Sequence, residues 1–159
     1  MVLNKKILRF INGIQKKNTR VYDVALAKST KEDSETKLHS GFEGGFQDPN
    51  QQFIVANNDI FASFVNVGVS LVDIPDNLGF TCVPGSHKGN FKIPKNITLY
   101  DDSPTVANVP IESGDAIVFT PLLRHGARKW TENFPRYTVF MRFIYAKQFH
   151  SNDSDRWLP

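Results

Sequence analysis

The segment "IFASFVNVGVSLVDI" (60–74) decides the fold class, because its apolar residues recur at alternate positions. Phe61, Val65, Val67, Val69 and Leu71 alternate with smaller or polar residues, which is the period of a strand with one buried face. Valine also favours the extended conformation, since its branched side chain packs well on a pleated surface. We therefore predict a strand here, the longest in the chain.

Shorter segments of similar character lie on both sides of this strand. They are "RVYDVALA" (20–27), "QQFIVANND" (51–59), "FTCV" (80–83), "ESGDAIVFTP" (112–121) and "RYTVFMRFIYA" (136–146). Asn57, Asn58 and Asp59 have turn chemistry, and Gly and Pro separate most of the other segments. Many short strands with tight turns predict a mainly β protein, an antiparallel sandwich or barrel of which the jelly roll is one kind.

The chain has 159 residues, which predicts one domain over 1–159. Residues 1–19 contain Ile7, Leu8, Ile11 and Ile14 at helical spacing among several Lys and Arg residues. They contain no Asp or Glu. We expect a basic amphipathic helix that packs on the domain and leaves its charged face in water. Residues 147–159 are expected to form a polar surface tail.

Composition limits the partners of the protein. The net charge is only +3, and no second basic stripe follows the helix, so we expect neither a nucleic-acid partner nor a membrane surface. No apolar run reaches the length of a membrane span. Cys82 is the single cysteine, so an intrachain disulfide is excluded and a reducing, cytoplasmic location is expected. The sequence leaves the oligomeric state open.

Two histidines and one arginine are the candidate functional residues. His39 lies in "TKLHSGFEGGF" (36–46), His125 in "FTPLLRHGARKW" (119–130), directly after a predicted strand, and Arg136 begins the last strand. Neighbouring strands of a jelly roll can direct such residues into one cavity, where two neutral imidazoles suit Fe(II) and a guanidinium suits a carboxylate. His87, in a Pro-Gly turn, is expected to stabilise its loop, and His150 lies in the tail.

Two longer stretches carry a resemblance to a known family. "VNVGVSLVDIPDNLGFTCVPGSHKGNF" (65–91) followed by "SGDAIVFTPLLRHGARKWTENFPRYTVFMRF" (113–143) resembles the phytanoyl-CoA dioxygenase family of Fe(II)/2-oxoglutarate oxygenases. The resemblance extends from about residue 20 to 145. It implies a double-stranded β-helix (jelly-roll, cupin-like) core in which a His-X-Asp…His triad binds iron.

Residue roles carried over from the family concern both candidate histidines and the arginine. His39 and His125 are the expected catalytic iron ligands, and Arg136 is expected to anchor the cosubstrate 2-oxoglutarate. Asp73, Gly85 and Ser86 match family positions with structural roles. The resemblance implies that a small organic substrate is hydroxylated after hydrogen abstraction by a ferryl species.

The sequence departs from the family pattern at the third iron ligand. Gly41 stands where the ligating Asp is expected, and Trp130 replaces an Asn common after the second His. The chain is also short at its N-terminus compared with the family and could be a fragment of a longer protein.

Three consequences of this glycine remain open. Glu43, or the more distant Asp48, could supply the missing carboxylate. Chloride could fill the vacancy, as in related halogenases. The chain could also be a catalytically inactive jelly-roll binding module. The sequence does not identify the substrate.

Overall fold

The structure, a computed structural model, describes residues 4–40, 51–89 and 104–147. Over these residues the chain forms, in order, α1 (Lys5–Ile14), β1 (Thr19–Ser29), β2 (Thr36–His39), β3 (Phe53–Ala56), β4 (Asp59–Ala62), β5 (Phe64–Ser70), β6 (Gly79–Cys82), the 3-10 turn η1 (Ser86–Lys88), β7 (Ala107–Asn108), β8 (Ala116–Phe119), β9 (His125–Arg128) and β10 (Arg136–Tyr145).

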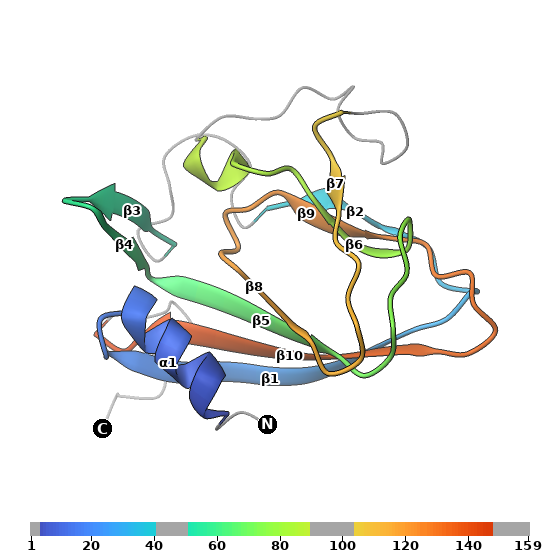
Figure 1. Ribbon diagram of the computed structural model, residues 1–159, viewed down its shortest axis with the longest axis horizontal. Coiled ribbons are helices and arrows are strands. Elements are labelled where there is room, and N and C mark those ends of the chain that lie inside the picture. Colours follow the sequence, from blue (N-terminus) through green and yellow to red (C-terminus); the bar gives the residue numbers. More distant parts are fainter. Residues whose placement is uncertain (1–3, 41–50, 90–103, 148–159) are drawn as a thin grey trace, which may run out of the picture.

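The strands build two antiparallel sheets and a separate hairpin. One sheet has the order β1-β10-β5-β8, the other has the order β2-β9-β6-β7, and β3 pairs only with β4. In Figure 1 the two sheets face each other, with the hairpin at the end of the molecule where α1 lies. The predicted mainly β, jelly-roll architecture with an N-terminal helix is therefore confirmed.

Alternation along β5 separates a packing face from a cavity face. Val65, Val67 and Val69 are buried in a core with Ile11 of α1 and with Met141 and Phe143 of β10. The intervening Asn66, Gly68 and Ser70 line a cavity between the sheets. Strand β10 repeats the pattern, since its residues 136, 138, 140 and 142 line the same cavity. The first sheet is thus covered by α1 on one face and open to a cavity on the other.

Helix α1 begins and ends at polar residues with clear roles. The Asn4 side chain accepts hydrogen bonds from the backbone N–H groups of Lys6 and Ile7, which caps the N-terminus. At the other end, buried Gln15 donates through Nε2 to the carbonyl oxygens of Ser63 and Phe143, at 3.1 and 3.2 Å. These bonds attach the helix to the ends of β5 and β10.

Two local predictions were wrong. The strand predicted over 60–74 is interrupted at Ser63, whose carbonyl oxygen accepts from Gln15 and whose N–H donates to the Gln52 carbonyl oxygen. The part before Ser63 forms β4, which pairs with β3 in the hairpin, and the part after it forms β5 of the β1-β10-β5-β8 sheet. His125 does not directly follow a strand, because residues 120–124 intervene and His125 is the first residue of β9.

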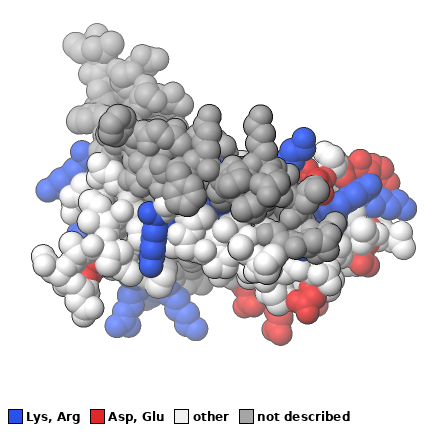
Figure 2. All heavy atoms as spheres, turned by 90° about the horizontal axis from the view of Figure 1, so that it is seen from above, with Lys and Arg blue, Asp and Glu red and all other residues white. Residues whose placement is uncertain are grey.

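Charged side chains are unevenly distributed on the surface. Figure 2 shows mainly basic side chains toward the end with α1 and most acidic ones toward the opposite end. Lys5, Lys6 and Arg9 of α1 are exposed, as expected for a solvated basic face. In the described part of the chain, no helix has the length and apolar character required to cross a membrane. The polar tail predicted over 147–159 lies, apart from Lys147, outside the described residues.

Candidate metal and cosubstrate site

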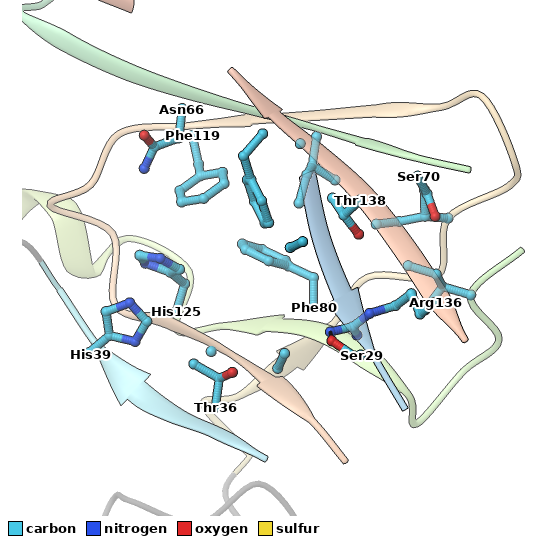
Figure 3. A pocket seen from close by; sticks show the side chains of 18 of the residues that line it. Ser29, Thr36, His39, Asn66, Ser70, Phe80, Phe119, His125, Arg136 and Thr138 are labelled. Atoms are coloured by element: carbon cyan, nitrogen blue, oxygen red, sulfur yellow. Dashed lines mark hydrogen bonds between the residues drawn. The ribbon is translucent and has the colours of Figure 1, made fainter. Parts of the chain in front are cut away.

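The cavity between the two sheets has a volume of about 260 Å³. Both sheets supply its walls, so residues distant in sequence meet there. His39, His125 and Arg136 all line it. Figure 3 shows the two histidines at one side of the cavity and Arg136 at the other, with Phe80 between them. The structure therefore brings all three of these candidate residues into one cavity.

His39 and His125 are opposite each other in the antiparallel ladder of β2 and β9. Side chains of directly opposed residues extend from the same face of a sheet and lie close together. The two ring centroids are 4.4 Å apart, and the ring planes are inclined at 50°. This distance is short enough for one nitrogen of each ring to reach a common ion.

Backbone hydrogen bonds determine which ring nitrogens are free. Nδ1 of His39 lies 2.9 Å from the Lys37 carbonyl oxygen, and Nδ1 of His125 lies 2.7 Å from that of Leu123. A carbonyl oxygen only accepts, so both Nδ1 atoms must carry the hydrogen. In the neutral rings both Nε2 atoms then retain a lone pair, which is the state that a metal ligand requires.

The surroundings of His125 keep its ring neutral. Burial lowers the pKa of His125 to about 4, the hydrogen bond to Leu123 opposes this shift, and nearby His39 adds slightly to it. Phe119 lies 4.6 Å from the His125 ring between centroids, and Phe80 stacks on it at 5.9 Å. Since imidazole binds metals only when neutral, His125 needs no deprotonation at neutral pH.

Arg136 occupies the other side of the cavity. Its Nη2 donates to Ser29 Oγ at 3.0 Å, and its guanidinium carbon lies 5.7 Å from the centroid of the Trp130 ring. Burial lowers the pKa of the Arg136 guanidinium, although arginine stays charged at neutral pH. No carboxylate of the described residues pairs with it. A half-buried, uncompensated guanidinium fits a ligand carboxylate.

Trp130, which replaces the expected Asn, supports this arginine. The Trp130 side chain is 2% exposed, and its Nε1 donates to the Phe134 carbonyl oxygen. Trp130 also packs with Ile74 and Ile111 in a second buried cluster. The substitution therefore adds apolar packing beneath Arg136.

Several polar residues of the cavity were missed by sequence reasoning. Asn66 and Ser70 of β5 and Thr138 of β10 all line it, and Asn66 Oδ1 is buried without a hydrogen-bond partner in the described residues. The signal was present in the alternation of β5, where polar or small residues follow each valine. The same alternation that marks the buried face therefore also marks the polar cavity face.

The other residues considered from sequence have structural surroundings. Ser86 Oγ accepts from the Arg124 backbone N–H, and Asp73 Oδ1 accepts from that of Ser113, each at 2.8 Å. Gly85 has a φ of +81° at the start of η1. The His87 ring makes an edge contact with Phe53 rather than facing the two site histidines.

The residues considered for the third iron ligand are all in one segment of the chain. Gly41, Glu43 and Asp48 lie outside the described residues, as does His150. Among the residues that are described, no group of three or more His, Cys, Asp or Glu side chains could hold a metal ion. The described part of the site thus provides two imidazoles.

Solved structures share this fold. HygX from Streptomyces hygroscopicus, with nickel and 2-oxoglutarate bound, superposes with a TM-score of 0.79 at 23% identity, covering 89% of this chain and 62% of HygX. AviO1 from Streptomyces viridochromogenes Tue57 gives a TM-score of 0.62 at 19% identity, covering 90% of this chain and 58% of AviO1. A nickel complex of the non-heme monooxygenase ThoJ gives a TM-score of 0.66 at 16% identity, covering 91% of this chain and 51% of ThoJ.

These similarities show the fold, and this chain is shorter than the proteins concerned. It spans between 62% and 65% of the length of the HygX structures. A search of curated protein sequences gives no match.

The family assignment comes from the sequence as a whole. The model of the family described as phytanoyl-CoA dioxygenase (PhyH) matches residues 5–137. That range covers most of the chain and includes both histidines and the arginine of the cavity. The protein therefore belongs to the phytanoyl-CoA dioxygenase family.

Proposed function

We propose that this protein is an Fe(II)/2-oxoglutarate-dependent oxygenase that hydroxylates a C–H bond of a small organic substrate. One observation carries the proposal. His39 and His125 present two Nε2 atoms, and Arg136 presents a guanidinium, to the same cavity, and none of these groups pairs with a carboxylate of the described residues. Family membership supports the same chemistry.

In this proposal His39 and His125 bind the iron, and Arg136 holds the distal carboxylate of 2-oxoglutarate. When bound, iron and cosubstrate together supply the activation of O₂ that C–H hydroxylation requires. Nδ1–H bonds to the backbone hold each imidazole in the ligating tautomer. Phe80 and Phe119 exclude water from His125, and Ser29 orients Arg136. HygX has been crystallised with iron and with 2-oxoglutarate, which supports the same pair of groups here.

The third protein ligand separates three versions of the proposal. Glu43 could bind the iron because Gly44 and Gly45 follow it and allow a pliable backbone. A halogenase would use the position left by Gly41 for chloride. An inactive binding module would keep the fold without turnover. We favour hydroxylation, since neither alternative has an observation of its own beyond Gly41.

The first experiment tests binding rather than turnover. Anaerobic Fe(II) and 2-oxoglutarate should give the visible charge-transfer band of a chelate, and His125→Ala should abolish it. His87→Ala is the matched control, because His87 lies against Phe53 outside the site and should leave the band unchanged. Absence of the band from wild-type protein saturated with both components would refute the proposal.

The second experiment separates the three versions. Conversion of 2-oxoglutarate to succinate is measured with and without chloride, in wild type and in Gly41→Asp. Turnover by wild type without halide supports hydroxylation with Glu43 or water at the iron. Turnover that requires halide in wild type, with hydroxylation gained by Gly41→Asp, establishes the halogenase. Metal binding without turnover in either protein establishes the binding module.

Substrate class and location follow from the same proposal. HygX has also been crystallised with hygromycin B, which supports a small-molecule substrate here, without indicating which one. A free cysteine and a ferrous ion both persist better under reducing conditions, so we propose a cytoplasmic location.

A further inference from the structure

A second hollow, which we call the apolar groove, lies between α1, the β3–β4 hairpin and the segment leading into η1. Its volume is about 400 Å³. Apolar side chains from five elements (α1, β3, β4, β5 and β8) form most of its wall, namely Phe10, Ile14, Phe53, Ile60, Val65 and Val118. Figure 1 shows the three bounding elements at the same end of the molecule.

The chemistry of the groove is that of a site for an uncharged group. None of its described lining residues is Lys, Arg, Asp or Glu, and its polar members are Cys82, His87 and Thr120. Phe10 and Ile60 at its rim are 56% and 46% exposed, although both are large apolar side chains. Exposed apolar surface beside a concave wall favours occupation by an apolar ligand.

The groove adjoins the cavity that contains the histidines. Phe119 lines both hollows, and its ring centroid is 4.6 Å from that of His125. Cys82, which lines the groove, is directly opposite His125 in the pairing of β6 with β9. The two hollows therefore adjoin at Phe119 and at the Cys82–His125 pair, whereas Val65 and Ile14 place the rest of the groove on the α1 side of the first sheet.

We infer that the apolar groove binds an uncharged, apolar portion of the substrate. Phe119 positions this portion beside the side of the cavity that holds His39 and His125. The substrate class is then one with an aliphatic or aromatic segment and no charge on that segment. Binding of the segment needs only the groove, whereas its role as substrate rests on the proposed oxygenase function.

Cys82 provides a reporter, because it is the only cysteine of the chain and lies in the groove wall. The probes are straight-chain primary alcohols from butanol to decanol. The rate of Cys82 alkylation is measured in metal-free protein at mildly alkaline pH as a function of alcohol concentration. The concentration that halves the rate should fall about fourfold for each added methylene until the groove is filled.

Two variants of the hairpin test the location of binding. Ile60→Asp places a charge in the groove wall and should weaken protection by octanol by tenfold or more. Ile54→Asp is the matched control, since Ile54 is 48% exposed, compared with 46% for Ile60, and does not line the groove. Strand pairing places Ile54 opposite Phe61, on the other face of the hairpin. Protection should be unchanged in this variant.

A second measurement connects the groove with the site. In protein loaded anaerobically with Fe(II) and 2-oxoglutarate, the alcohols that protect Cys82 should shift the charge-transfer band with the same chain-length dependence. Protection without any shift of an existing band would overturn the substrate role. If no band forms while protection is graded, the oxygenase proposal fails and the apolar binding site remains.

Two results would overturn the groove itself. One is alkylation that is unaffected by chain length, or equally protected in Ile60→Asp and wild type. The other is protection that depends on protein concentration instead of alcohol, which would mean that a second copy covers this surface.

Discussion

Gly79 and Arg136 approach each other so closely that a Cβ atom on Gly79 would lie 3.0 Å from Nη1 of the arginine. The same Cβ would lie 2.5 Å from Cγ2 of Ile74, and Gly79 has a φ of +69°, in the region that other residues rarely adopt. Glycine at the start of β6 thus gives the guanidinium the space that it occupies in the cavity.

Gly79→Ala should lower both stability and cosubstrate affinity. A residue with a side chain at this φ costs about 1 kcal/mol, and the contact with Ile74 and Arg136 adds to that cost. Urea unfolding and calorimetric titration of the iron-loaded protein with 2-oxoglutarate measure the two effects. Gly114→Ala is the control, because Gly114 has a φ of +94° but open space around its Cβ position. Gly114→Ala should lower stability and leave the affinity for 2-oxoglutarate unchanged. Equal losses of this affinity in the two variants would contradict the role of Gly79.

Arg136→Met should remove cosubstrate binding while leaving the fold intact. Without 2-oxoglutarate the guanidinium has no anionic partner in the described residues, so methionine loses little in the unliganded protein. Affinity for 2-oxoglutarate should fall by roughly 30-fold or more, as when one partner of a buried charge pair is removed. Thermal unfolding with and without the cosubstrate measures this.

Arg128→Gln is the control for this variant. Arg128 donates through Nε to Asn108 Oδ1 at 2.7 Å and does not line the cavity. It should retain the full upward shift of the unfolding temperature on addition of 2-oxoglutarate. A full shift in Arg136→Met would exclude the anchoring role.

Asn66→Leu should stabilise the metal-free protein and weaken ligand binding. Its Oδ1 is buried and has no hydrogen-bond partner within the described part of the chain, and removal of such a group is worth about 1 kcal/mol. If the amide instead serves iron-bound or cosubstrate atoms in the loaded site, the variant should bind 2-oxoglutarate less tightly.

Thr81→Val provides the comparison for Asn66→Leu. Thr81 Oγ1 is also buried without a hydrogen-bond partner among the described residues, yet Thr81 does not line the cavity. Valine has nearly the same shape, so stability should rise by about 1 kcal/mol, with no change in the affinity for 2-oxoglutarate. Unchanged affinity in both variants would assign Asn66 no role in binding.

Stability of the metal-free protein should fall as the pH falls from about 6.5 to 4. Burial lowers the pKa of His125 to about 4 in the folded protein, whereas an unfolded histidine titrates at about 6.5. Between these values the unfolded chain binds a proton that the folded chain does not, so acid favours unfolding. Urea titrations in a chelator across this range measure the slope. His125→Asn should lack this contribution, and an identical slope in both proteins would rule it out.

Sequence patterns were sufficient for the elements that have one buried face. Alternating valines identified β5, and the Asn57-Asn58 turn identified the link between β3 and β4, where both residues have positive φ. Helix α1 followed from its apolar spacing. In each case a local period or turn chemistry corresponds to a local structure.

Tertiary relationships could not be derived from periodicity. Ser63 interrupts the predicted long strand because Gln15, 48 residues earlier, bonds to its carbonyl oxygen. The opposition of His39 and His125 depends on the register of β2 with β9, which no local pattern specifies. The resemblance to the family indicated the pair, and the register explains why the pair can meet.

The Nδ1–H bonds of the two histidines link ring orientation to backbone conformation. Each ring is aimed by a carbonyl group two residues before it, so fraying at the end of β2 would turn His39 away from His125. An ion bound by both rings would cross-link β2 and β9. Its loss would first become visible as faster amide hydrogen exchange at those strand ends, before any change in the rest of the sheet.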